Sequence, residues 1–88
     1  MTKENLIRLG VDAQKKFNIV SDFDIVFVAT KERQVAITVR DKKGFMGYGV
    51  DTAYLETWVS SDGNESADVG YAPRAKILVV RFRDTPND

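Results

Sequence analysis

The segment 42–49, with the sequence KKGFMGYG, carries the side chains best suited to contact another molecule. Its three glycines fall within six residues and leave two aromatic rings and a methionine with little side-chain cover. Nucleic-acid bases stack on exposed rings, and Lys42 and Lys43 could meet phosphates. Phe45 and Tyr48 are therefore candidate contact residues. The alternative interpretation is a glycine-rich bend between two strands, with both rings folded onto the edge of the core.

Charged residues are segregated along the chain, although thirteen basic and thirteen acidic residues cancel overall. Residues 31–43 hold five basic and two acidic side chains, residues 51–68 hold five acidic and no basic ones, and residues 74–83 hold four basic and no acidic ones. Such blocks commonly pair with one another as exposed ion pairs. Alternatively, a basic face presents its guanidinium groups to an acidic protein surface or to phosphates. The arginines of that face are Arg40, Arg81 and Arg83.

The residue types needed for catalysis or for a metal site are scarce. The chain contains neither cysteine nor histidine, which removes the thiolate nucleophile, the commonest general base and the commonest zinc ligands. Residues 62–68 place oxygen-bearing side chains at alternate positions, as a calcium loop does, but Ala67 and Pro73 stand where that loop needs glycine and its last acidic ligand. Nothing ties the carboxylates of Asp51 and Glu56 to a cleft. We therefore expect no catalytic residue, no metal and no cofactor, and hence no enzyme.

Residues 3–17 have the apolar spacing of an amphipathic helix that must pack on the strands of the fold. Thr2 can cap its start and Asn18 can end it. Gly10 costs this helix about 1 kcal/mol relative to alanine, a cost that we attribute to close packing on a sheet. The apolar positions are Leu6, Leu9, Ala13 and Phe17.

Strand patterns occupy much of the remaining chain. Residues 23–30 and 34–40 are rich in β-branched and aromatic side chains, and the short polar link between them predicts a β-hairpin. Residues 76–83 alternate in the same way and predict a third strand. Residues 50–60 favour a fourth strand over a short helix. Residues 60–75 have no periodicity and contain several turn-forming residues, so we expect a long loop there, and the tail 84–88 should be frayed.

These strands carry more apolar side chains than one helix can cover. One set would face the helix, namely Phe23, Ile25, Phe27, Val35, Ile37, Val39, Leu78, Val80 and Phe82. The opposite set is Val26, Val28, Ala36, Ile77 and Val79. Either the middle of the chain folds back over the second face, or a partner such as a second copy covers it.

The sequence therefore predicts a single α+β domain, residues 1–88, in which an N-terminal helix packs on an antiparallel sheet of three or four strands. Residues 1–5 are polar and no stretch is apolar enough to span a membrane, so we expect a cytoplasmic protein with no membrane partner.

The function that best fits these features is that of a non-catalytic protein–protein interaction module. It would be a small regulator or inhibitor that occupies a partner's surface, with homodimerisation expected. Large amphipathic aromatics and arginines dominate such interfaces. The expected anchors are Phe45, Tyr48, Tyr54, Trp58 and Tyr71, oriented by Arg40, Arg81 and Arg83. The alternative is a single-stranded nucleic-acid-binding protein that uses the glycine-aromatic segment and the arginine face, against which the balanced net charge counts.

Overall fold

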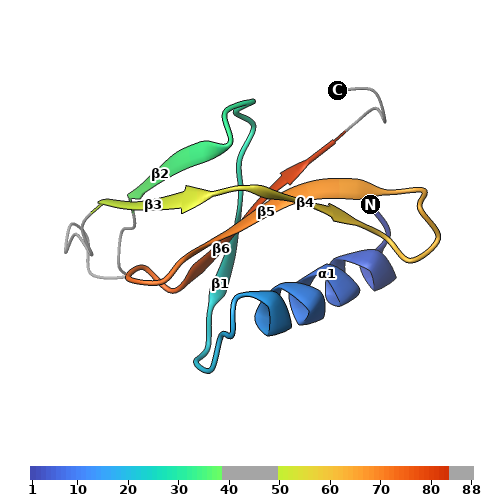
Figure 1. Ribbon diagram of the computed structural model, residues 1–88, viewed down its shortest axis with the longest axis horizontal. Coiled ribbons are helices and arrows are strands. Elements are labelled where there is room, and N and C mark those ends of the chain that lie inside the picture. The colour runs from blue at the N-terminus through green and yellow to red at the C-terminus, as the bar shows by residue number, and fades with distance from the viewer. Residues whose placement is uncertain (39–49, 84–88) are drawn as a thin grey trace.

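The computed structural model describes residues 1–38 and 50–83. Within these ranges the chain forms three layers, which Figure 1 shows as a helix below a four-stranded sheet and a separate pair of strands above it. The predicted α+β class, with an N-terminal helix packed on a sheet, is confirmed.

The helix α1 (Lys3–Lys16) begins and ends where the sequence predicts. Thr2 is its N-cap, because the Thr2 hydroxyl accepts a hydrogen bond from the Asn5 N–H at 3.1 Å. After the last turn, Asn18 adopts a positive φ of 53°, the left-handed geometry that ends many helices. Among the described residues, no helix is long and apolar enough to cross a membrane.

The main sheet is mixed and has the strand order β1-β6-β5-β4. The first strand, β1 (Asp24–Phe27), runs parallel to β6 (Ile77–Phe82), so the sheet is not antiparallel throughout as predicted. The neighbouring strand β5 (Ser66–Ala72) is antiparallel to β6, and β4 (Glu56–Val59) is antiparallel to β5. Thus β6 and β5 are central, whereas β1 and β4 form the two edges.

The predicted hairpin between residues 23–30 and 34–40 is wrong. Strand β2 (Gln34–Thr38) pairs instead with β3 (Val50–Tyr54), and these two form the second sheet. The polar link after β1 carries the chain out of the main sheet into another layer rather than reversing it within one sheet.

The middle of the chain is also richer in strands than the sequence indicated. Residues 50–60 are extended, as favoured, and they form two strands, β3 and β4. The loop predicted for residues 60–75 is wrong, because β5 lies inside it. This strand has weak strand propensity, since Ala67, Gly70 and Ala72 are small, and the buried position between two neighbours determines its conformation.

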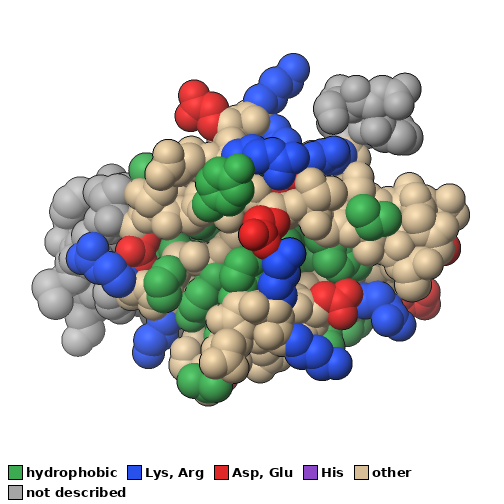
Figure 2. All heavy atoms as spheres, in the orientation of Figure 1, with side chains coloured by type: hydrophobic (Ala, Val, Ile, Leu, Met, Phe, Trp, Pro, Cys, Tyr) green, Lys and Arg blue, Asp and Glu red, His purple; other side chains and the backbone are tan. Residues whose placement is uncertain are grey.

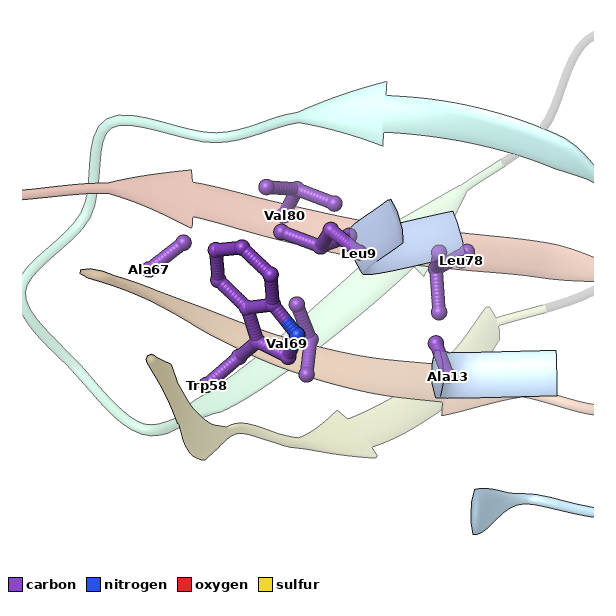
Figure 3. Packing of buried hydrophobic residues seen from close by; sticks show 7 residues of the cluster. All are labelled: Leu9, Ala13, Trp58, Ala67, Val69, Leu78 and Val80. Atoms are coloured by element: carbon purple, nitrogen blue, oxygen red, sulfur yellow. The ribbon is translucent and has the colours of Figure 1, made fainter. Parts of the chain in front are cut away.

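The first core lies between α1 and the main sheet. Leu78 and Val80 of β6 are fully buried against the helix, and Phe17 and Phe23 pack at the margin. Figure 3 shows how the indole ring of Trp58 lies among these aliphatic groups. The cluster consists of Leu9, Ala13, Trp58, Ala67, Val69, Leu78 and Val80.

The second core lies on the other face of the same sheet, under the β2–β3 pair. Ile77 and Val79 of β6 are buried there, so the chain itself covers the face that lacked a helix. Self-association through that face therefore has no basis. Val35 and Ile37 were expected to face the helix, but they belong to this second cluster. The cluster consists of Val35, Ile37, Ala53, Leu55, Ala72, Ile77 and Val79.

The chain passes between the layers at Leu55, which links β3 directly to β4. This crossing brings the backbone onto β5 at Gly70, where an added Cβ would lie 2.6 Å from the Tyr54 carbonyl oxygen and 2.9 Å from Leu55 Cδ2. Only glycine allows so close an approach. Gly10 differs, because an added Cβ would meet nothing within 4 Å, so the close packing predicted there is not observed.

These two glycines give a matched test of the fold. We expect Gly70→Ala to lower the free energy of unfolding by about 2 kcal/mol or more, because a backbone carbonyl cannot move aside easily. Gly10→Ala should raise it by up to about 1 kcal/mol through helix propensity. Urea unfolding followed by circular dichroism measures both. Equal effects of the two substitutions would contradict the crossing at Gly70.

Candidate functional site

Asp68 is the most unusual polar residue of the described chain, because its carboxylate has no exposed surface. It lies in the middle of β5, opposite Arg81 of β6 and Thr57 of β4. On this face of the sheet the apolar cover of β2 and β3 gives way to charged side chains. A buried carboxylate is costly unless cations and hydrogen-bond donors surround it. Its neighbours therefore define a built polar site.

Three arginines surround this carboxylate. Arg81 donates from Nε to Asp68 Oδ2 at 2.9 Å and also from Nη2 to the same oxygen. Arg83 donates from Nη2 to Oδ1 at 2.8 Å, and Arg33 Nη1 lies 3.6 Å from Oδ1. We call Arg33, Arg81 and Arg83 the arginine cluster. Since it comes from the start of β2 and the end of β6, it joins the two sheets.

Further hydrogen bonds fix the guanidinium groups in place. Arg33 donates to the Leu55 carbonyl at 3.1 Å and to the Thr57 hydroxyl at 3.3 Å. Arg81 donates to the Thr30 carbonyl at 3.2 Å. Arginines held in this way lose little further freedom when they bind an anion, which favours recognition.

The pKa of Asp68 reports the same balance of forces. Burial by itself raises the pKa of this carboxyl, but the hydrogen bonds from Arg81 and Arg83, together with their charges, outweigh burial and hold the pKa below its ordinary value of 3.8. Asp68 is therefore ionised at neutral pH. Its single negative charge faces three guanidinium groups, so within residues 1–38 and 50–83 two positive charges of the cluster remain unbalanced.

A hollow of about 580 Å³ opens beside the cluster. Its lining combines the cluster with one lysine and three apolar residues: Lys31, Arg33, Arg81, Arg83, Val28, Ala29 and Phe82. We call it the basic pocket. Figure 2 shows blue Lys and Arg side chains gathered between the start of β2 and the end of β6. In the described chain, the buried Nε of Arg83 has no hydrogen-bond partner, and an anion that reached it would satisfy this donor.

The chemistry that this site supports is anion binding. A planar guanidinium matches the two oxygens of a carboxylate or phosphate, and several fixed guanidinium groups add specificity to the charge. Phe82 and Val28 supply apolar contact next to the charges. In the described ranges, no group of three or more acidic, histidine or cysteine side chains is placed to hold a metal ion.

The predicted site residues are distributed unevenly over the structure. Arg81 and Arg83 lie together in the cluster, whereas Arg40, Phe45 and Tyr48 lie outside the described residues. The remaining predicted anchors belong to three strands.

Tyr54 is 63% exposed, on β3 next to the Leu55 carbonyl that Arg33 holds. Tyr71 is half-buried and stacks on Phe17, with ring centroids 6.4 Å apart. Trp58 is buried in the helix-side core and its Nε1 donates to Asp12 Oδ2 at 3.0 Å, so a partner cannot reach it and we leave it out of the site.

The carboxylates considered for calcium or for hydrolysis have other partners. Asp62 Oδ1 accepts hydrogen bonds from the Ser60 hydroxyl at 2.5 Å and the Asn64 N–H at 3.0 Å, which lower the pKa of Asp62 and shape the β4–β5 turn. Asp51 accepts from the Ala75 N–H, and Glu56 pairs with Lys16 at 2.7 Å. These contacts join elements of the fold to one another.

Sequence reasoning missed Asp68, Arg33 and Lys31 as members of the site. A usable signal was Arg81, which alternates with Ile77 and Val79 and therefore shares their face of the sheet. A charge beside a buried face needs a counter-charge, and the acidic block before it contains Asp68. Pairing between the acidic and basic blocks does occur at Asp68, where three arginines face one carboxylate among the described residues.

Comparison with families of known proteins, with curated proteins and with solved structures gave no match for this chain. The residues of the site are therefore the basis for any functional proposal.

We expect Asp68→Asn to lower the free energy of unfolding by about 3 kcal/mol at neutral pH, because the arginines lose their buried counter-charge. The folded pKa lies below the ordinary value, so ionised Asp68 stabilises the fold above about pH 4, and this contribution is lost as the pH falls through the folded pKa. The difference between wild type and variant should therefore be constant above about pH 4 and shrink below it.

Urea unfolding at a series of pH values measures this difference. Asp22→Asn, a substitution at an exposed position, is the control and should change stability little. A difference between wild type and Asp68→Asn that does not change with pH would contradict an ionised Asp68.

Proposed function

We propose that this protein is a non-catalytic interaction module that binds an acidic segment of a protein partner in the basic pocket. The observation that carries the proposal is the arginine cluster, in which one buried carboxylate fixes three guanidinium groups and neutralises only one of their charges. An acidic side chain of a partner would supply the missing negative charge. In this proposal the chain acts as a small regulator or inhibitor by occupying the partner's surface.

The surroundings of the cluster support a protein ligand. Phe82 lines the pocket and is 39% exposed, and Tyr54 stands on the strand that Arg33 contacts. Aromatic side chains beside arginines form the anchors of many protein interfaces. The cluster is compact, so it fits one or two acidic groups.

A single-stranded nucleic acid is the second candidate ligand. It is favoured by the exposed rings of Phe27 and Phe82, which stack on each other with centroids 5.0 Å apart, because a base could stack on this pair. Against it, non-specific binding of single strands uses a basic groove that follows the backbone over several nucleotides, whereas this positive charge is gathered at one point. We therefore place the acidic protein segment first.

The test is a titration of the protein with two kinds of probe, extended peptides that contain aspartate and glutamate and a single-stranded oligothymidine. We expect the acidic peptides to bind, and Arg33→Gln to weaken this binding about tenfold through the loss of a charge-assisted hydrogen bond. Arg8→Gln, which removes an exposed arginine on α1, is the matched control and should leave the affinity unchanged.

Thermal melts must show that Arg33→Gln is folded, because Arg33 also holds the Leu55 carbonyl. Peptides in which amides replace the carboxylates should not bind. Tight oligothymidine binding that weakens steeply with salt would instead select the nucleic-acid function. An equal loss of peptide binding in the Arg8 and Arg33 variants would exclude the basic pocket as the binding site.

A further inference from the structure

Strand β1 has one edge that no other described strand contacts. The N–H groups of Asp24 and Val28 donate to the carbonyls of Lys76 and Val80, at 3.0 and 2.9 Å, on the β6 side. Backbone groups alternate in direction along a strand, so the N–H and C=O groups of Ile25 and Phe27 point away from β6. Within residues 1–38 and 50–83 no strand pairs with this side of β1.

This edge lacks the features that normally prevent edge-to-edge pairing. From Ile25 to Ala29 there is no charged residue and no proline. Both edge strands of the main sheet begin with an acidic residue, Asp24 in β1 and Glu56 in β4, and Glu56 forms an ion pair with Lys16 of α1. Among the described residues, the β1 edge beyond Asp24 is therefore available to another strand.

Apolar side chains lie along the same edge on the helix side of the sheet. Ile25 is 37% exposed and Phe27 is 52% exposed, because α1 does not extend over them. Phe27 stacks on Phe82 of β6, which is also exposed. Soluble proteins rarely expose a group of large apolar side chains without a partner for them.

The two ends of β1 carry opposite charges. Exposed Asp22 and Asp24 stand at its start, and the basic pocket, which includes Val28, Ala29 and Lys31, follows its end. The register places Asp24 on the same face as Val26 and hence as Arg81. A second β1 running antiparallel about a two-fold axis would bring the acidic start of each copy to the basic end of the other.

We propose that two copies of this chain form a homodimer by antiparallel pairing of their β1 strands. The pairing satisfies the free backbone groups of Ile25 and Phe27, brings Ile25 and Phe27 of both copies together on the helix side, and places Asp24 of each copy beside the basic pocket of the other. The surface is self-complementary in hydrogen bonds, in apolar contact and in charge, which is what an isologous interface requires.

Such a dimer has a consequence for the proposed binding function, although the inference does not depend on that function. The two four-stranded sheets join into one continuous sheet, and both basic pockets lie on the same face of it. Asp24 adds one negative charge to each pocket, where Lys31 and the unbalanced arginines keep the sign positive. A dimer would therefore offer two binding sites to one acidic partner, and bivalent binding strengthens the overall affinity.

Sedimentation equilibrium over a range of concentrations tests the dimer, with Phe27→Lys as the main variant. This substitution puts two lysines near each other at the interface, so dimerisation should weaken about tenfold or more. It also removes the stacking of Phe27 on Phe82, so its stability must be measured beside its association. Ile7→Lys, at an exposed apolar position on α1, is the matched control and should dimerise as wild type does. Thermal melts verify that both variants are folded.

Two further measurements bear on the pairing itself. Hydrogen exchange of the Ile25 and Phe27 amides should slow as protein concentration rises, because in the described residues of one copy no strand pairs with them. The Val28 amide, which bonds to Val80, should be protected throughout. Asp24→Lys should weaken association at low salt and approach wild type at high salt, where charge repulsion is screened. A strictly monomeric wild type at several hundred micromolar, or a dimer that Phe27→Lys leaves unchanged, would overturn the proposal.

Discussion

Strand β6 alternates between two cores, with Leu78 and Val80 against the helix and Ile77 and Val79 against the β2–β3 pair. A strand that is apolar on both faces cannot lie at the surface of a small protein, so each face must be covered by a separate layer. One helix supplies the first cover. The second comes from the chain segment that leaves the main sheet after β1 and returns to it through Leu55. The three-layer arrangement follows from this requirement.

The same alternation creates the polar site where the apolar cover ends. Arg81 is the next residue after Val79 on the face of β6 that the β2–β3 pair covers, and Asp68 lies opposite it on β5. A charge at that depth requires a counter-charge, and Asp68 supplies it. Because Arg33 lies at the start of β2, its contacts also hold the β2–β3 pair to the main sheet. Structural support and a surplus of positive charge thus arise from one set of contacts.

The connection between β1 and β2 links the binding pocket to the free edge of the sheet. Val28 and Ala29 continue the line of β1 and also line the basic pocket. The basic pocket therefore lies directly beside the strand edge that no other described strand contacts. In this arrangement the proposed dimerisation and the proposed acidic ligand use neighbouring surfaces, and the dimer would determine how two pockets are oriented toward one partner.

The sequence by itself determined the helix 3–16, the strand 77–82 and the α+β class, because these depend on local periodicity and on capping residues within a few positions. It also indicated that a second cover was needed and that the basic and acidic blocks could pair. Only the tertiary structure decided which strands are neighbours, since β1 joins β6 across about fifty residues and its alternation fits several partners equally well. Burial between two neighbouring strands likewise explains why β5 is a strand despite its small residues. The tertiary structure also buries Asp68, one of several acidic residues in its block, at the centre of the site.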